Sequence, residues 1–184
     1  MNLSEIISEA DMLVPNEVPI ADKVLWLNAL NQDFFNVVKI PRILKFDCVV
    51  GQEDYVLAAD VRQKNIDLVM IGMFPYKSLD RDAITPAQNA YAYDDTAKTL
   101  SLFPAPYGNL KGFLRYRRMA TTTFTASALA VSPDAPEEYH WTFIPALASM
   151  LANSQDDSVK ASNYENQYKA AWNVAAQNYQ AGAS

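Results

Sequence analysis

The last third of the chain begins with Phe113-Leu114-Arg115-Tyr116-Arg117-Arg118, and a breaker run, Ser132-Pro133-Asp134-Ala135-Pro136, separates this segment from the C-terminal residues. The alternation of apolar and basic residues predicts a β-strand whose arginines 115 and 117 share one face. Beyond the breaker run, apolar spacing predicts a helical block over 137–153 and a second one, rich in Tyr and Ala, over 159–180. No catalytic constellation accompanies this ordered ending, which favours a structural assembly protein over an enzyme.

The two closing helices have clear boundary signals. Asp134 is positioned to cap the first helix, with Pro136 in its first turn. Pro145 lies inside this block and predicts a kink near Thr142. In the final helix an aromatic row follows the helical repeat, and it comprises Tyr164, Tyr168, Trp172 and Tyr179.

The first 40 residues predict another pair of helices. Asn2 and Glu5 have capping-box spacing at the start of a helix over 3–13. A second helix over 20–39 is expected to end before Pro41, because proline disfavours the helical conformation in the residue that precedes it.

Between these helix pairs the periodicity becomes that of strands. Strands are expected at 43–50, 55–59, 66–71, 90–93, 98–103 and 113–121, and a polar loop that includes Asp80 and Asp82 is expected at 76–88. The predicted fold class is α+β: a helical bundle from the N- and C-terminal helix pairs, with an inserted small antiparallel β-sheet module of four to six strands. A single domain over 1–184 is expected, with N-terminal helices in 1–40, the β module in 41–131, and C-terminal helices and tail in 132–184.

Composition limits the class of protein. The chain has 184 residues, half of them apolar, which is enough for a sizeable core. Its single cysteine, Cys48, cannot form an internal disulfide, so a reducing compartment is expected. The chain starts with a polar helix rather than an apolar leader, and no apolar run is long enough to span a bilayer. Neither secretion nor a membrane partner is expected.

The net charge of −6 is distributed unevenly along the chain. Residues 1–60 carry 10 acids and 4 bases, residues 61–118 carry 5 acids and 9 bases, and residues 119–184 carry 6 acids and 2 bases. An acidic protein is a poor general binder of nucleic acid, whereas a polarised one can stack against complementary neighbours or present one basic face. Chance clustering of charges on solvated strands is the simpler alternative.

Residues that carry chemistry are sparse. His140 is the only histidine and Cys48 the only cysteine, so one chain cannot supply the three or four ligands of an ordinary zinc site. A Cys–His dyad lacks any flanking signature. Neighbouring carboxylates fall in predicted turns, where Asp satisfies backbone N–H groups; these pairs are Asp80 with Asp82, Asp94 with Asp95, and Asp156 with Asp157. No catalytic residue, metal or cofactor is expected.

Two sets of residues are candidates for contacts with other molecules. Arg115, Arg117 and Arg118 form a candidate channel or partner face, because basic residues interleaved with aromatic ones suit nucleic acid or an acidic neighbour. The simpler alternative is a half-buried strand whose polar side chains face water. The aromatic row of the final helix is either a core face or an interface. The core is favoured for Trp172, and an interface is favoured for Tyr179.

Five segments carry a family resemblance: Leu3-Ser4-Glu5-Ile6-Ile7, Lys23-Val24-Leu25-Trp26-Leu27-Asn28, Tyr93-Asp94-Asp95, Leu114-Arg115-Tyr116-Arg117-Arg118 and Pro136-Glu137-Glu138-Tyr139-His140. In these segments, scattered over nearly the full length, the chain resembles the head-to-tail connector (adaptor, or neck) proteins of tailed bacteriophages, in particular a long form with a β insertion.

The resemblance implies a structural virion protein of the neck, made in the host cytoplasm. A homo-oligomeric ring, commonly of twelve subunits, would dock beneath the portal protein, extend the DNA channel and join the next neck or tail protein. Genomic DNA would pass through without sequence-specific binding. By this likeness residues 159–184 would contact the portal, and strands around 90–120 would line the channel or meet the next neck protein. The alternatives are a stand-alone protein-binding module, or another neck protein such as a stopper or tail-completion protein.

Overall fold

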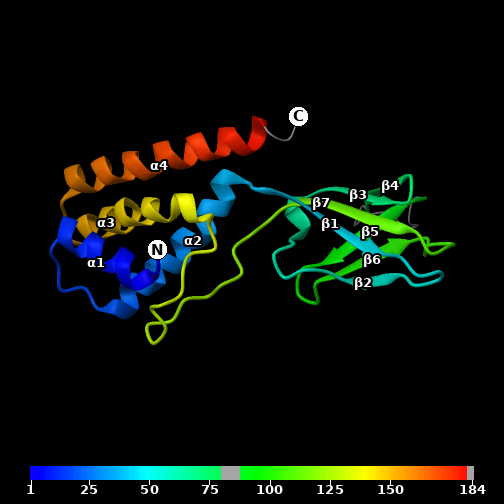
Figure 1. Ribbon diagram of the computed structural model, residues 1–184, viewed down its shortest axis with the longest axis horizontal. Helices are drawn as coiled ribbons and strands as arrows, with labels where there is room; N and C mark the ends of the chain where they lie inside the picture. The colour runs from blue at the N-terminus through cyan, green and yellow to red at the C-terminus, as the bar shows by residue number, and fades with distance from the viewer. Residues whose placement is uncertain (80–87, 182–184) are drawn as a thin grey trace. The chain divides into compact units, whose positions relative to one another are not determined.

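The computed structural model describes residues 1–79 and 88–181. Within these residues, four α-helices and seven β-strands form two units (Figure 1). The helical unit comprises Met1–Lys39 and Ala120–Ser184, and the sheet unit comprises Ile40–Met119. The predicted acidic turn at Asp80 and Asp82 and the last tail residues, 182–184, lie outside the described residues.

The first two helices of the helical unit begin and end close to their predicted limits. They are α1 (Leu3–Leu13) and α2 (Ile20–Val38). The Asn2 side chain accepts a hydrogen bond from the Glu5 backbone at 3.0 Å, and the Glu5 side chain accepts one from the Asn2 backbone at 2.9 Å. The predicted capping box is therefore confirmed. Helix α2 ends at Val38, and the following residue, Lys39, caps it with a left-handed φ of 55° two residues before Pro41.

The closing helices include a change of helix type. A 3-10 helix, η2 (Glu137–Thr142), leads into α3 (Phe143–Ser154), and α4 (Ser158–Ala181) follows. The backbone changes from 3-10 to α at Thr142, where Pro145 predicts a kink. The predicted cap at Asp134 is wrong, because Pro136 precedes η2 and no side chain caps it.

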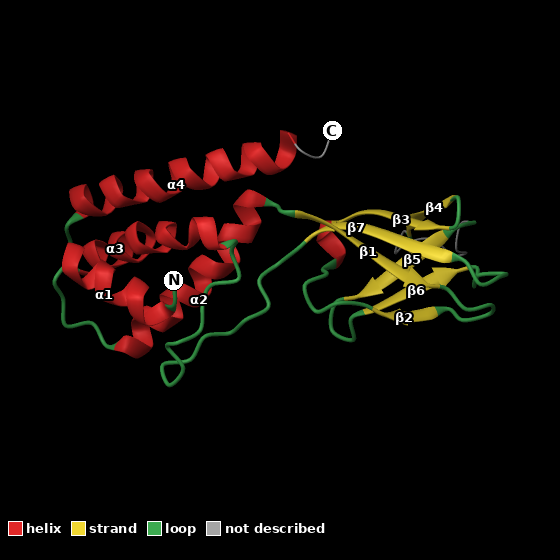
Figure 2. Cartoon of the chain, viewed as in Figure 1, coloured by secondary structure: helices red, strands yellow, loops and turns green. Residues whose placement is uncertain are grey.

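The core of the helical unit lies where the apolar faces of its helices meet. Helix α4 packs on α3 and α2, and α1 packs on α3 (Figure 2). At the centre, the Phe34 ring lies edge-on to Trp172 with centroids 5.5 Å apart, and Phe143 packs against both rings. Such aromatic contacts add specific geometry to the burial of apolar surface.

The sheet unit contains seven strands and one 3-10 helix, η1 (Gln63–Asn65). The strands are β1 (Pro41–Asp47), β2 (Asp54–Val56), β3 (Ile66–Ile71), β4 (Phe74–Ser78), β5 (Ala90–Asp94), β6 (Thr99–Phe103) and β7 (Lys111–Arg117). They form one curled sheet in the order β1-β7-β3-β4-β5-β6-β2. Neighbouring strands are antiparallel except β4 and β5, which are parallel.

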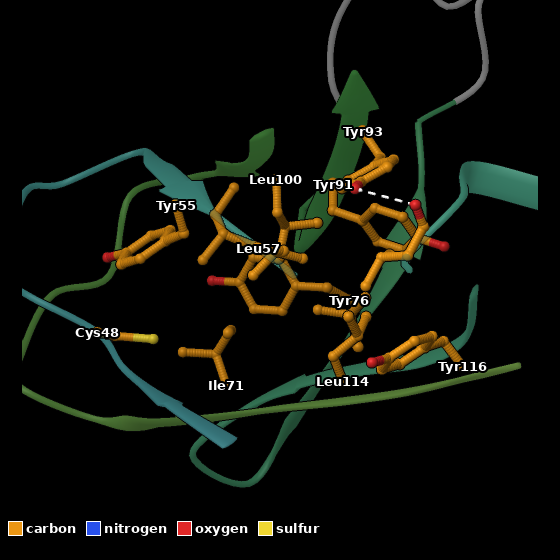
Figure 3. Packing of buried hydrophobic residues seen from close by; sticks show 13 residues of the cluster. Cys48, Tyr55, Leu57, Ile71, Tyr76, Tyr91, Tyr93, Leu100, Leu114 and Tyr116 are labelled. Carbon is orange, nitrogen blue, oxygen red and sulfur yellow. Dashed lines mark hydrogen bonds between the residues drawn. The ribbon is translucent and has the colours of Figure 1, made fainter. Parts of the chain in front are cut away.

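The curled sheet has its own core on its inner face (Figure 3). The core combines aliphatic residues such as Ile71, Leu100 and Leu114 with five tyrosines: Tyr55, Tyr76, Tyr91, Tyr93 and Tyr116. Tyrosine is expected to find a hydrogen-bond partner when buried. The Tyr55 hydroxyl donates to the Gln52 carbonyl at 2.9 Å, and the Tyr93 hydroxyl donates to the Val61 carbonyl at 3.4 Å.

The predicted fold class is wrong: the protein is not a helical bundle with a small inserted antiparallel sheet. The sheet is a mixed, seven-stranded structure with a core of its own. The local pattern does not predict β4, because Pro75 interrupts it and its last two residues are polar. Local sequence pattern also does not predict which distant strands pair, such as β1 with β7, where Pro41 lies opposite Arg117.

Candidate functional site

The arginines of 113–118 lie on or next to β7, which is an internal strand of the sheet. β7 pairs with β1 on one side and with β3 on the other. Leu114 and Tyr116 are fully buried in the inner core, whereas Arg115 is exposed on the opposite face. The predicted alternation of this segment is therefore confirmed. The strand is shorter than predicted, since it ends at Arg117 rather than at Thr121.

Strand pairing builds an outer sheet face around Arg115. One row across the sheet aligns Ile43, Arg115 and Leu68, and the next row aligns Lys45, Phe113 and Met70. The outer sheet face consists of Ile43, Lys45, Leu68, Met70, Lys111, Phe113, Arg115 and Arg117. The Lys45 ammonium lies 5.7 Å from the centre of the Phe113 ring, which suits a cation–π contact.

Acidic side chains neutralise only part of this face. Lys111 forms an ion pair with Asp47, and the Arg117 Nε lies 3.4 Å from an Asp67 carboxylate oxygen. Among the described residues, no carboxylate lies within ion-pair distance of Lys45 or Arg115. These two cations remain exposed, so the outer sheet face carries a net positive charge.

Arg118 lies outside this arrangement. It follows the end of β7, and its backbone N–H donates to the Ile40 carbonyl at 3.1 Å. The structure therefore brings Arg115 and Arg117 together on one face, while Arg118 belongs to the segment that leaves the sheet.

A polar network around the buried Asp60 and Tyr116 side chains lies behind β7, and no sequence signal indicated it. The Tyr116 hydroxyl donates to Asp60 at 3.0 Å, and an Arg42 guanidinium nitrogen donates to the other Asp60 oxygen at 2.9 Å. Desolvation by burial, reinforced by the negative charge of Asp60, raises the pKa of Tyr116 to about 12. The network links β1 and β7 to the segment before η1, and so it fixes the strands that display the outer face.

The aromatic row of α4 divides between core and surface. Trp172 is only 2% exposed, and its indole N–H donates to the Thr142 hydroxyl at 2.9 Å, so its predicted place in the core is confirmed. Tyr168 packs edge-on against Trp172 with centroids 4.8 Å apart. Tyr164 and Tyr179 are partly exposed. The surface of α4 also presents two exposed valines, Val159 and Val174.

The remaining candidates for chemistry have structural partners. Cys48 is buried, and burial raises the pKa of its thiol, which opposes formation of a reactive thiolate. His140 places its Nε2 at 2.8 Å from the Ala135 carbonyl oxygen. Asp94 accepts hydrogen bonds from the Thr96 and Ala97 backbones, as expected for an aspartate in a turn.

Neither a metal-binding cluster nor a membrane-spanning helix is present in the described part of the chain. In the ranges 1–79 and 88–181, no three His, Cys, Asp or Glu side chains converge to bind a metal ion. Nor do these residues include a helix long and apolar enough to cross a membrane.

Comparison with known proteins places the whole chain in a family context. A family model described as SU10 adaptor protein matches residues 1–184. No curated protein matches the chain.

Proposed function

Because the chain belongs to the SU10 adaptor protein family, a family of phage head-to-tail adaptors, we propose that it is a structural virion protein of the phage neck. In this role it docks beneath the portal protein and joins the next neck or tail protein. The observation that carries this proposal is the extent of the family match, which covers both the helical unit and the sheet unit. Both units therefore belong to one adaptor subunit.

The proposed assembly is a homo-oligomeric ring, a dodecamer by family resemblance, that extends the DNA channel. Genomic DNA passes through it without sequence-specific contacts. Two surfaces support a bridging role. One is the outer sheet face, and the other is the exposed side of α4. We assign portal contact to residues 159–184, and channel or partner contact to the outer sheet face.

Portal binding tests this function. The full-length chain is mixed with portal rings, and the complexes are separated by sedimentation. Val174→Asp should reduce the bound fraction about tenfold, because it places a charge in a surface that binding would desolvate. Val174 is 56% exposed, so the variant should fold normally. Val56→Asp, at an 80% exposed position of β2, is the matched control and should bind like the unmodified chain. The proposal fails if no complex forms with a portal or with any other neck component.

The outer sheet face has a separate test in the virion. Arg115→Glu combined with Arg117→Glu should leave the protein folded, since both side chains lie on the outer side of β7. The same change should block neck assembly or DNA retention. A normal yield of infectious phage from this double variant would contradict an assembly role for the face.

A further inference from the structure

The outer sheet face combines positive charge with exposed apolar surface. Ile43 is 63% exposed, and Leu68, Met70 and Phe113 are partly exposed. Strand pairing places these four apolar side chains in two adjacent rows, with Lys45 and Arg115 among them. Contiguous apolar patches rimmed by polar residues mark sites of protein association.

The composition of the face favours a protein partner over DNA. Phosphate groups are bound by clustered Lys and Arg, and apolar side chains contribute little to that contact. Here two of the four cations are paired with acids, Lys111 with Asp47 and Arg117 with Asp67. Those carboxylates would repel a phosphate backbone. An acidic and partly apolar protein surface suits the face better.

The chain itself carries such a surface where α1 ends and α2 begins. We call it the acidic corner; it consists of Glu9, Met12, Leu13, Glu17, Ile20 and Asp22, all of which are exposed. Met12 is 71% exposed and Ile20 is 47% exposed. Residues 1–22 contain five acids and neither Lys nor Arg. The acidic corner thus pairs negative charge with apolar side chains, as the outer sheet face pairs positive charge with them.

Local contacts hold the acidic corner in shape and keep it negative. The next basic residue in the sequence, Lys23, is only 4% exposed, and its ammonium binds both Asp11 carboxylate oxygens at 2.7 and 2.8 Å. This ion pair joins the end of α1 to the start of α2. The Asn16 side chain adds hydrogen bonds to Asp11 and to the Val18 backbone within the connecting segment. The positive charge of Lys23 is therefore paired with Asp11 and does not neutralise the exposed acids of the acidic corner.

We propose that the outer sheet face of one copy binds the acidic corner of the next copy. Charge complementarity supports this pairing, since the helical unit has twelve acids against four bases, a net −8, and the sheet unit has nine acids against eleven bases, a net +2. Contact between two different surfaces of identical chains is heterologous, and such contacts generate a ring when the rotation between neighbouring subunits closes. The inference rests on the proposed function, because it names the surfaces through which adaptor subunits meet.

Two charge-reversal variants of the full-length chain test the pairing. The sheet variant carries Lys45→Glu and Arg115→Glu, and the corner variant carries Glu9→Lys and Glu17→Lys. Self-association is measured by sedimentation over a concentration series at low salt, and subunit occupancy is measured on portal rings. Each variant alone should associate at least about tenfold more weakly than the unmodified chain, because like charges then face each other. The equimolar mixture should restore association, since each reversed surface meets an opposite one.

A matched control separates the pairing from net charge. Lys64→Glu with Lys98→Glu gives the same change in charge as the sheet variant at the η1 and β5–β6 end of the sheet unit, and association should stay within about twofold of the unmodified chain. The inference is overturned if the mixture fails to restore association, or if the control variant is equally impaired. It is also overturned if the sheet variant associates normally and instead loses binding to a DNA duplex.

The two proposals fail in distinguishable ways. If the chain occupies the portal ring and all the variants do so equally, the pairing is wrong and the adaptor function stands. If the chain associates in a charge-dependent manner but binds neither a portal nor any other neck component, the adaptor function is wrong and the pairing stands. If the unmodified chain associates neither with itself nor with any of these components, both are wrong.

Discussion

At the scale of single residues, close packing constrains Gly112 of the sheet unit. Gly112 lies opposite Phe46 in the β1–β7 pair, and the Phe46 ring covers it. A Cβ atom at position 112 would lie 2.4 Å from the ring, well inside van der Waals contact. Glycine in the interior of a strand is unfavourable by itself. At position 112 it is needed because only a residue without a side chain lets the Phe46 ring pack this close to the strand.

The substitution Gly112→Ala should therefore lower the free energy of unfolding by about 1–3 kcal/mol, as expected for overpacking. Gly108→Ala is the matched control, since nothing lies within 4 Å of the added methyl group, and it should change stability by less than about 0.5 kcal/mol. Urea denaturation measures both. In a Phe46→Ala background the cost of Gly112→Ala should shrink, and an unchanged cost would refute the packing explanation.

Tyr116 provides a pH-dependent test of the buried network. Its pKa is raised from 10.0 to about 12, so the network stabilises the fold below pH 10 and this stabilisation is lost as pH rises from about 10 to 12. Tyr116→Phe should cost about 1.5–3 kcal/mol at pH 8, because a hydrogen bond to the Asp60 carboxylate is lost.

The stability gap between the unmodified chain and Tyr116→Phe should narrow as the pH rises through 10. Urea denaturation at pH 8, 10 and 11.5 measures it. The other tyrosines are present in both proteins, so their titration cancels in the comparison. A gap that stays constant over this range would show that Tyr116 does not titrate as inferred.

At the scale of elements, the long segment between β7 and η2 has no helix or strand, and hydrogen bonds to α1 and α2 fix its position. The Asn28 side chain of α2 exchanges two hydrogen bonds with the Phe124 backbone, at 3.0 and 2.7 Å. The first backbone N–H groups of α1 donate to carbonyls of the same segment, Leu3 to Val131 and Ser4 to Leu129. The segment thereby satisfies donors that a helix start leaves unpaired.

Asp134 is the most connected residue of this segment. One carboxylate oxygen accepts hydrogen bonds from the Thr121 and Thr122 backbones and from the Asn31 side chain, at 2.8–3.0 Å. Burial opposes ionisation of the carboxyl, but the hydrogen bonds outweigh it and hold the pKa of Asp134 below its ordinary value. Its contribution to stability is therefore present above about pH 4 and lost as pH falls below that.

Asp134→Ala should lower the free energy of unfolding by about 2–3 kcal/mol at pH 7, because charge-assisted hydrogen bonds are lost and their donors are left without a protein partner. The effect should diminish at pH 3, where the unmodified chain also loses the charge. Thermal denaturation followed by circular dichroism measures this, with Asp33→Ala, at an exposed position of α2, as the control. Equal destabilisation by the two substitutions would count against the proposed role of Asp134.

At the scale of the whole molecule, charge is segregated between the two units. The helical unit carries −8 and the sheet unit carries +2. Opposite charge on different surfaces favours ordered contacts between copies, provided that the ionic strength is low enough for the charges to interact.

Association between copies should therefore depend on salt. Raising sodium chloride from about 0.05 M to about 0.5 M should weaken self-association at least about tenfold, because exposed charges are screened over a shorter distance. Sedimentation measures this, and the control is the mixture of sheet and corner variants, which should show a similar salt dependence. Association that strengthens with salt would indicate an apolar interface and would contradict the charge pairing.

The aromatic row of α4 and the segment 113–118 show what sequence pattern alone can predict. The spacing of Trp172 in α4 and the alternation of Leu114 with Arg115 are local properties, and both predict the correct face. The role of Asp134 is not local. Its spacing before η2 suits a helix cap, yet its partners come from α2 and from residues twelve and thirteen positions earlier in the chain. Pattern cannot rank such competing partners, because their distances depend on the completed fold.

The sequence alone predicts the helix limits and the capping box at Asn2, because these depend on residues within one or two helical turns. It also predicts the basic side of β7, because side chains of a strand alternate between its two faces. The sequence alone does not predict the seven-stranded curled sheet. Its local pattern contains no signal for the pairing of β1 with β7 or for the parallel pairing of β4 with β5. The outer sheet face exists only through that pairing. In the sequence, Ile43 and Leu68 are distant from Arg115, and strand pairing in the folded sheet places them beside it. Burial of the tyrosine-rich core selects this strand order.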